Sequence, residues 1–220
     1  ITDIPLIEYV ASKGKPVIIS TGIARQEDIE LALDACHRMG NYDVALLKCT
    51  SSYPAPIEEA NMCMVKDLAE RYDVISGPEL ETDEYCFVIS GLSDHTMGST
   101  VPVVATVFGA KKKKKHFIID RAIGGPDASF SMNEEEFTAM VKAVREAERA
   151  SGVVDYNLTE KQAKGRDFSR SLYVAEDIVA GELFTEKNLR SVRPGFGLHP
   201  KYYNQLLGKK AATNLEKGTP

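Results

Sequence analysis

Short apolar runs alternate along the chain with longer amphipathic segments, and this alternation most constrains the fold. Helical patterns are expected at 25–40, 57–72, 101–110 and 133–152. The predicted strands are Pro16–Ser20, Val44–Thr50, Phe87–His95 and His116–Asp120. Strands separated by helices run parallel, and their unbroken apolar character indicates burial on both faces. The sequence therefore predicts an α/β fold with about four βα units, roughly half of a TIM (β/α)₈ barrel. An open four-stranded sheet is the alternative.

The alternation divides the chain into parts. Residues 1–152 carry it, whereas residues 153–169 are polar and lose apolar periodicity, which predicts a linker. Short apolar runs and turn signals over 170–220 predict a compact β-rich module, truncated at its end. The chain opens at Ile1 without an initiator methionine and enters a helix capped by Thr2 or Asp3, so we expect a fragment that lacks its beginning.

Composition limits the class of partner. The formal net charge of −5 argues against general nucleic-acid affinity, although five consecutive lysines, Lys111–Lys115 (the lysine run), lead into the predicted fourth strand. No apolar run approaches the roughly 18 residues of a membrane span. The four cysteines form no CxxC pair and are expected to be buried free thiols. We expect a cytoplasmic protein that binds neither nucleic acid nor a membrane.

Polar side chains gather where the predicted strands end, which is where parallel α/β barrels carry their reactive groups. The hydroxyls of Ser20, Ser51 and Ser93 suit a phosphate or carboxylate group. His95 and His116, on neighbouring strands, suit a divalent metal or an acid/base pair. Simpler explanations stay open. The serines can satisfy backbone groups at strand ends, and the histidines can be structural residues held by hydrogen bonds.

Several motifs together are specific: STGIA, KCTSSYPAP, GLSDHTMG, KHFIIDRAIGGPDASFSMNEEEF and RSVRPGFGLHPK. In these motifs the chain resembles the sialic acid synthase family, whose members condense phosphoenolpyruvate with an N-acetylated hexose. The resemblance runs from Ile1 to Pro220 and is interrupted mainly at 78–88 and in the lysine run. KCTSSYPAP with GLHPK looks closer to the pseudaminic acid synthase branch. The resemblance implies an eight-stranded barrel followed by a small antifreeze-like (SAF) domain, here 170–220.

The resemblance also implies roles for individual residues. His95 and His116 would bind Mn²⁺ or Mg²⁺, which polarises the aldehyde oxygen of the sugar. Carbon 3 of phosphoenolpyruvate then attacks the aldehyde carbon, water adds at carbon 2, and phosphate leaves with C–O cleavage. Tyr53 and Asp127 would act at the sugar as catalytic residues, with Phe168 at the edge of the site. The other implied substrate contacts are Ser20, Ser51 and Ser93 at the phosphate, and Arg193, delivered to the partner's barrel in a domain-swapped homodimer.

The lysine run departs from the family. Relatives carry an apolar pair and then a glutamate before the KHF motif, so Lys114 stands where an active-site glutamate belongs. Strand alternation puts Lys112 and Lys114 on the same face as His116, pointing into the barrel. Because an ammonium repels a divalent cation, we expect weakened metal binding and little catalysis. A sequence error or a disrupted gene is the alternative explanation of the run.

Two further departures concern the completeness of the barrel. The family's glutamate, serine and lysine on the strand before Ile1 are absent, which leaves open sheet edges and an apolar interior, and we expect this chain alone to be inactive. The segment VISG occurs at Val74–Gly77 and again at Val88–Gly91, which suggests a local duplication whose first copy is a loop or a spare edge segment.

The sequence therefore favours a synthase of the pseudaminic acid type, with three alternatives. An N-acetylneuraminate or legionaminic acid synthase is the first. A non-catalytic remnant that binds a sugar or a partner is the second, favoured by Lys114. The third is a basic module that binds polyanions through Lys111–Lys115, in which case binding would collapse as the salt concentration rises.

Overall fold

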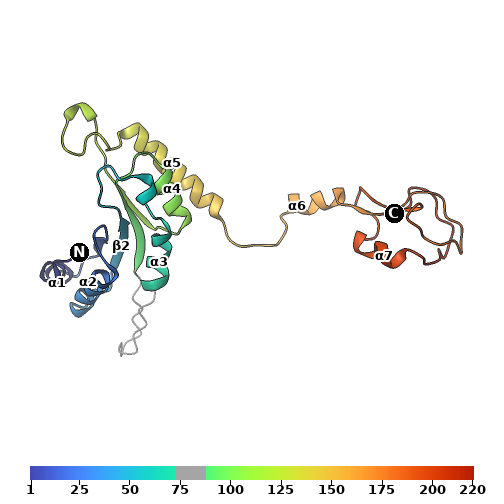
Figure 1. Cartoon of the computed structure of the whole chain (residues 1–220), viewed down its shortest axis with the longest axis horizontal. Coiled ribbons are helices and arrows are strands. Elements are labelled where there is room, and N and C mark those ends of the chain that lie inside the picture. Colours follow the sequence, from blue (N-terminus) through green and yellow to red (C-terminus); the bar gives the residue numbers. More distant parts are fainter. Residues whose placement is uncertain (73–87) are drawn as a thin grey trace. The chain divides into compact units, whose positions relative to one another are not determined.

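A computed structural model describes residues 1–72 and 88–220 of the chain (Figure 1). Within these ranges the chain forms two compact units, Ile1–Val153 and Val154–Pro220, which are described separately. The first VISG copy, Val74–Gly77, and Cys86 lie outside the described residues. Among the helices that the structure describes, none combines the length and the apolar character needed to cross a bilayer.

The first unit is built on a four-stranded parallel sheet in the order β1-β2-β3-β4. The strands are β1 (Val17–Ser20), β2 (Val44–Cys49), β3 (Ile89–Asp94) and β4 (Lys112–Lys115). The two central strands are buried along almost their whole length, as the unbroken apolar runs predicted. The prediction of a half-barrel α/β sheet is therefore confirmed.

Helices pack against one face of this sheet. They are α1 (Ile4–Ala11), α2 (Gln26–Arg38), α3 (Cys63–Tyr72), α4 (Thr100–Val107) and α5 (Glu134–Ser151). Leu46 of β2 packs in one core cluster with α2 and α3, and Leu92 of β3 packs in another with α3 and α4. Because strand side chains alternate, Leu47, Gly91 and their neighbours in register point to the opposite face, here called the inner face.

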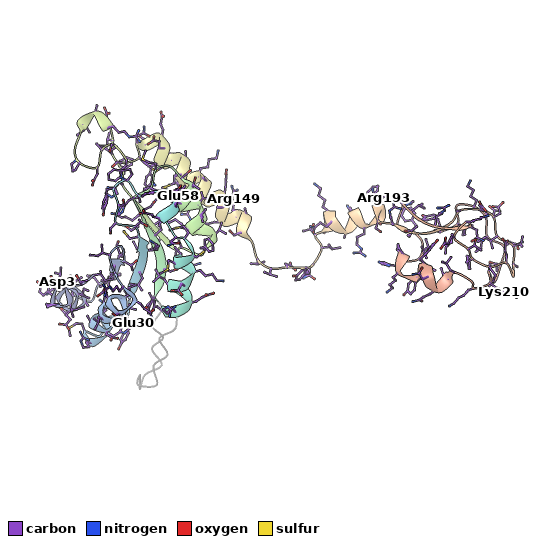
Figure 2. The ribbon with its side chains drawn as sticks, viewed as in Figure 1. Asp3, Glu30, Glu58, Arg149, Arg193 and Lys210 are labelled. Carbon is purple, nitrogen blue, oxygen red and sulfur yellow. The ribbon has the colours of Figure 1, made fainter. Side chains whose placement is uncertain are left out.

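Capping residues set the helix ends. Asp3 caps α1 by accepting a hydrogen bond from the Leu6 N–H, and Figure 2 labels it at the start of the chain. Asn133 begins α5 with a capping box to Glu136. The helix predicted over 57–72 is wrong at its start: the chain forms a 3₁₀ turn (Ile57–Glu59), and Asn61, with a φ of 50°, separates it from α3. Cys63, expected to be buried, is exposed.

The fourth strand lies earlier than predicted. The ladder with β3 pairs Gly91 with Lys112 and ends at Asp94 with Lys115, so the lysines form the strand and His116 follows it. The apolar residues after His116 are not buried, since Phe117 is 51% exposed and Ile119 is 80% exposed. Beyond the ladder with β3, Phe117 forms an isolated parallel bridge with Met132.

Alternation explains how lysines can form this strand. Lys113 and Lys115 point to the helix-covered face, where the side chain of Lys113 is only 14% exposed and its ammonium donates to the Ala110 carbonyl. The ammonium of Lys115 is almost completely buried and binds the carboxylate of Asp94 and the Thr96 carbonyl. Lysine stems can pack as apolar groups when the charged end has a partner.

The second unit begins with α6 (Glu160–Gly165) and a 3₁₀ turn (Arg166–Phe168), within the predicted linker. Its two-stranded antiparallel sheet joins β5 (Ser171–Val174) to β6 (Leu189–Val192). A second 3₁₀ turn (Pro200–Tyr202) leads into α7 (Tyr203–Leu206). The small core comprises Leu172, Val174, Ile178, Leu189 and Ala211. The unit is compact, with short strands and many turns, as the sequence predicted.

We predict that Lys115→Met destabilises the first unit by about 3–5 kcal/mol, because the Asp94 carboxylate would stay buried without a cation. Lys112→Met is the matched control: the side chain is exposed on the same strand, so its effect should stay within about 0.5 kcal/mol. Urea unfolding and hydrogen exchange of the β3 amides each measure the stability of the two variants. Equal unfolding midpoints for the two variants would contradict the prediction. A double variant, Lys115→Met with Asp94→Asn, should recover part of the lost stability, because it removes the unpaired buried charge.

Candidate functional site

A cavity of about 230 Å³ opens where the strands end, in the region predicted to carry reactive groups. Its lining comprises Ile1, Ser20, Gly22, Ile23, Cys49, Ser51, Tyr53, Ser93, His95 and Lys114. Five of the predicted site residues are therefore brought together. They come from the ends of β1, β2 and β3, or from the loops that follow these strands.

The three predicted serines are free to act on a ligand. None of the hydroxyls of Ser20, Ser51 and Ser93 makes a hydrogen bond within the described parts of the chain, so the simpler explanation, that they satisfy strand-end backbone groups, does not hold. Ser93 is only 2% exposed, yet it lines the cavity. The Ser93 hydroxyl is not among the buried atoms without a partner in the described parts of the chain, so it reaches the cavity, where a ligand or water can bind it.

Gly22 permits the tight approach of two loops in this lining. A Cβ at this position would lie 2.1 Å from the Ser51 hydroxyl oxygen and 2.9 Å from the Cys49 sulfur. The preceding residue, Thr21, is fixed by its N–H and its hydroxyl, which both donate to the Leu47 carbonyl. Any larger residue at position 22 would therefore displace the Ser51 hydroxyl from its place in the lining.

His95 has a defined tautomer. Its Nδ1 lies 2.8 Å from the Thr50 carbonyl oxygen. Because a carbonyl only accepts hydrogen bonds, Nδ1 carries the proton and the Nε2 lone pair is available to a ligand. The ring of Tyr53 packs on His95 with 4.3 Å between centroids, and a hydrogen bond from the Ala55 N–H to the His95 carbonyl holds their two loops together.

His116 lies beside His95, with 5.1 Å between the ring centroids and an angle of 64° between the planes. Its Nδ1 is 3.4 Å from a carboxylate oxygen of Asp127. Burial, followed by the Lys114 ammonium, lowers the pKa of His116 below its usual range, while Asp127 acts in the opposite direction. His116 is therefore neutral at pH 7, which is the form that binds metals.

Backbone pairing places Asp127 near His116. The Met132 N–H donates to the His116 carbonyl, and the Ile118 N–H donates to the Met132 carbonyl. This pairing returns the 120–132 loop to the end of β4 and brings the buried ring of Phe130 to 5.1 Å from His116.

Three contributors were missed by the sequence reasoning. Phe130 contacts the rings of both Tyr53 and His116, and the Sγ of Cys49 lies 3.9 Å from the Nδ1 of His95. The Thr50 carbonyl that orients His95 is a backbone atom. The only available signal was the position of Cys49 and Thr50 at the end of a predicted strand.

Two predicted site residues belong to the other unit. Phe168 is 70% exposed at the end of a 3₁₀ turn, and Arg193 follows β6 (Figure 2). Their predicted contact with a barrel site therefore stays a prediction.

The two histidines suit a metal in their chemistry. Metal-binding imidazoles commonly direct the second ring nitrogen to a carbonyl or carboxylate, as His95 does to Thr50 and His116 to Asp127. Among the residues that the structure describes, no group of three or more His, Cys, Asp or Glu side chains could hold an ion. Lys114 adds a positive charge to the same cavity. The imidazoles fit a metal, and the ammonium beside them opposes it.

The parallel half-barrel sheet places this chain in the barrel class of α/β proteins, and its hydroxyl and imidazole side chains lie at the strand ends, as is usual in that class. Residues 1–156 match the model of the NeuB family, and residues 169–220 match the SAF domain. The chain belongs to the NeuB family. The expected resemblance to sialic acid synthases is thereby confirmed.

Similar proteins give the relationship more detail. The chain is 43% identical to a pseudaminic acid synthase of Campylobacter jejuni, over 96% of this chain and 58% of the relative. It is 41% identical to a pseudaminic acid synthase of Helicobacter pylori, over 100% of this chain and 61% of the relative. An N,N'-diacetyllegionaminic acid synthase of Legionella pneumophila is 31% identical, over 100% of this chain and 59% of the relative. The chain thus spans about three fifths of these relatives.

Solved structures agree with the fold. A spore coat polysaccharide biosynthesis protein from Bacillus subtilis superposes with a TM-score of 0.59 at 31% identity, covering 99% of this chain and 63% of that one. An N-acetylneuraminic acid synthetase from Leptospira borgpetersenii, solved with citrate, gives a TM-score of 0.63 at 26% identity, covering 74% of this chain and 52% of that one.

We predict opposite tautomers for two histidines. His95 should carry its proton on Nδ1, whereas His199, whose Nδ1 accepts a hydrogen bond from the Lys201 N–H, should carry it on Nε2. Long-range ¹H–¹⁵N correlation spectra of the imidazoles at neutral pH distinguish the two forms. An Nε2-protonated His95 would remove the basis for a ligand at that nitrogen.

Proposed function

We propose that this chain provides the histidine-bearing part of a nonulosonic acid synthase that condenses phosphoenolpyruvate with an N-acetylated hexose, most closely of the pseudaminic acid type. The observation that carries the proposal is the cavity in which three unbonded serine hydroxyls meet His95. The identity of 41–43% to pseudaminic acid synthases, against 31% to a legionaminic acid synthase, favours the pseudaminic acid branch.

The residues of the cavity divide into two sets by chemistry. The hydroxyls of Ser20, Ser51 and Ser93 would donate to the phosphate of phosphoenolpyruvate. Tyr53 and Asp127 would act at the sugar, with the Tyr53 ring packed on His95 and edge-on to His116, and the Asp127 carboxylate beside the Nδ1 of His116. Tyr53 is 57% exposed, so its hydroxyl can reach a ligand that enters the cavity.

His95 and His116 would hold a divalent metal, Mn²⁺ or Mg²⁺, through their Nε2 atoms. When bound, such an ion supplies a Lewis acid for the aldehyde oxygen of the sugar. The protein's own contribution is to fix both rings from behind, through the Thr50 carbonyl and the Asp127 carboxylate.

The second unit would act in an assembly. We propose that residues 153–169 link the barrel part to the SAF domain at 170–220, and that the SAF domain of one subunit delivers Arg193 and Phe168 to the barrel of its partner in a homodimer. The guanidinium of Arg193 would hold an anionic substrate group in bidentate fashion. A cytoplasmic location fits a reaction that consumes phosphoenolpyruvate.

A second candidate is a non-catalytic protein that binds the substrates or a partner. Lys114 in the cavity lining favours it, because the resemblance to the family implies a glutamate at this position. The polyanion-binding alternative loses support, since the ammonium groups of Lys113 and Lys115 are engaged within the fold, facing Glu148 and Asp94.

Titration of the full chain with phosphoenolpyruvate, and separately with an N-acetylated hexose, tests the proposed function. We expect each substrate to shift the NMR signals of Tyr53 and His95, while glucose leaves them unchanged. No shift at millimolar substrate would sink the proposal. We expect no phosphate release when both substrates are present, because Lys114 opposes the metal. Measured release would instead rule out the non-catalytic candidate.

Metal binding gives a separate prediction. Lys114→Glu should bind Mn²⁺ at least about tenfold more tightly than the unchanged chain, because a repulsive charge is replaced by an attractive one. Lys112→Glu makes the same charge change two residues earlier, outside the cavity lining, and should have a much smaller effect. Electron paramagnetic resonance of free Mn²⁺ measures both affinities. Equal affinities for Lys114→Glu and the unchanged chain would contradict the expected repulsion.

A further inference from the structure

Lys114 is the one lysine of β4 that lines the cavity. The register pairs Lys114 with Ser93, and both side chains line the cavity on the inner face. Its neighbours Lys113 and Lys115 point to the other face and are engaged there with Glu148 and Asp94. Within the described residues Lys114 has no ion-pair partner.

The cavity offers donors without a competing carboxylate. Its lining contains no aspartate or glutamate, and the carboxylate of Asp94 is held on the opposite face by Lys115. The unbonded hydroxyls of Ser20, Ser51 and Ser93 point to a ligand that accepts hydrogen bonds. A single positive charge surrounded by hydroxyl donors is the complement of an oxyanion.

We propose that Lys114 makes this cavity an oxyanion site that binds a phosphate group without the help of a divalent cation. The inference deepens the proposed function, because the oxyanion can be the phosphate of phosphoenolpyruvate or free phosphate. The ammonium supplies the charge neutralisation that a metal ion would otherwise give, and the serine hydroxyls hold the phosphate oxygens. The charge of Lys114 then favours an anion in this cavity and disfavours a metal ion.

Binding of inorganic phosphate to the full chain, measured by calorimetry in the presence of EDTA, tests this. Lys114→Gln, which keeps the length and removes the charge, should weaken binding at least about tenfold, as expected for loss of a charge-assisted hydrogen bond. Lys114→Arg should retain most of the affinity. Lys112→Gln, exposed on the same strand but absent from the lining, is the matched control and should bind as the unchanged chain does.

A parallel titration with phosphoenolpyruvate separates the two sources of the oxyanion. Tighter binding of phosphoenolpyruvate than of phosphate, with the same loss in Lys114→Gln, supports a substrate site, and equal binding supports a site for free phosphate. No phosphate binding, binding that needs Mn²⁺, or binding unaffected by Lys114→Gln would each overturn the inference. Failure of the proposed function has a different signature: phosphate binds through Lys114 while the N-acetylated hexose does not bind.

Discussion

The parallel register between β3 and β4 is the constraint on which the rest of this structure depends. It pairs Ser93 with Lys114 and Asp94 with Lys115, so adjacent residues on each strand face opposite sides of the sheet. On the helix-covered face Asp94 and Lys115 neutralise each other in the interior. On the inner face Ser93 and Lys114 share the cavity. A shift of β4 by one residue would turn its side chains to the opposite faces of the sheet and separate Lys115 from Asp94.

The sheet was predictable because both faces of its central strands are buried, and this leaves a clear apolar run in the sequence. The fourth strand was misplaced for the same reason: Phe117 and Ile119 resemble a buried strand, whereas lysines resemble a solvated loop. Hydropathy assigns one value to a whole side chain. It could not register that the stem of Lys115 is buried while its ammonium is matched by a carboxylate on the neighbouring strand.

The candidate site was predictable to the extent that it follows from strand ends. Ser20, Ser51, Ser93 and His95 do meet in one cavity, and His116 lies next to them. The supporting contacts were not predictable, because the orientation of His95 depends on a backbone carbonyl and the position of Asp127 depends on pairing between residues 116–118 and Met132. Such contacts carry no signature in residue type. Arg193 lies in a separate unit, so geometry within one unit does not test its role.

Charge at a single position links the two chemistries that this cavity can support. His95 and His116, as the proposed metal ligands, would favour a cation, whereas the unbonded hydroxyls of the serines favour an anion. With an ammonium at position 114 the balance moves to the anion, because the repulsion acts on the metal alone. The fold accommodates an ammonium at Lys114 because this side chain is exposed, whereas a charge change at Lys115 would fall on a buried pair. The half-barrel can therefore keep its structure while the charge at position 114 sets whether the cavity favours an anion or a cation.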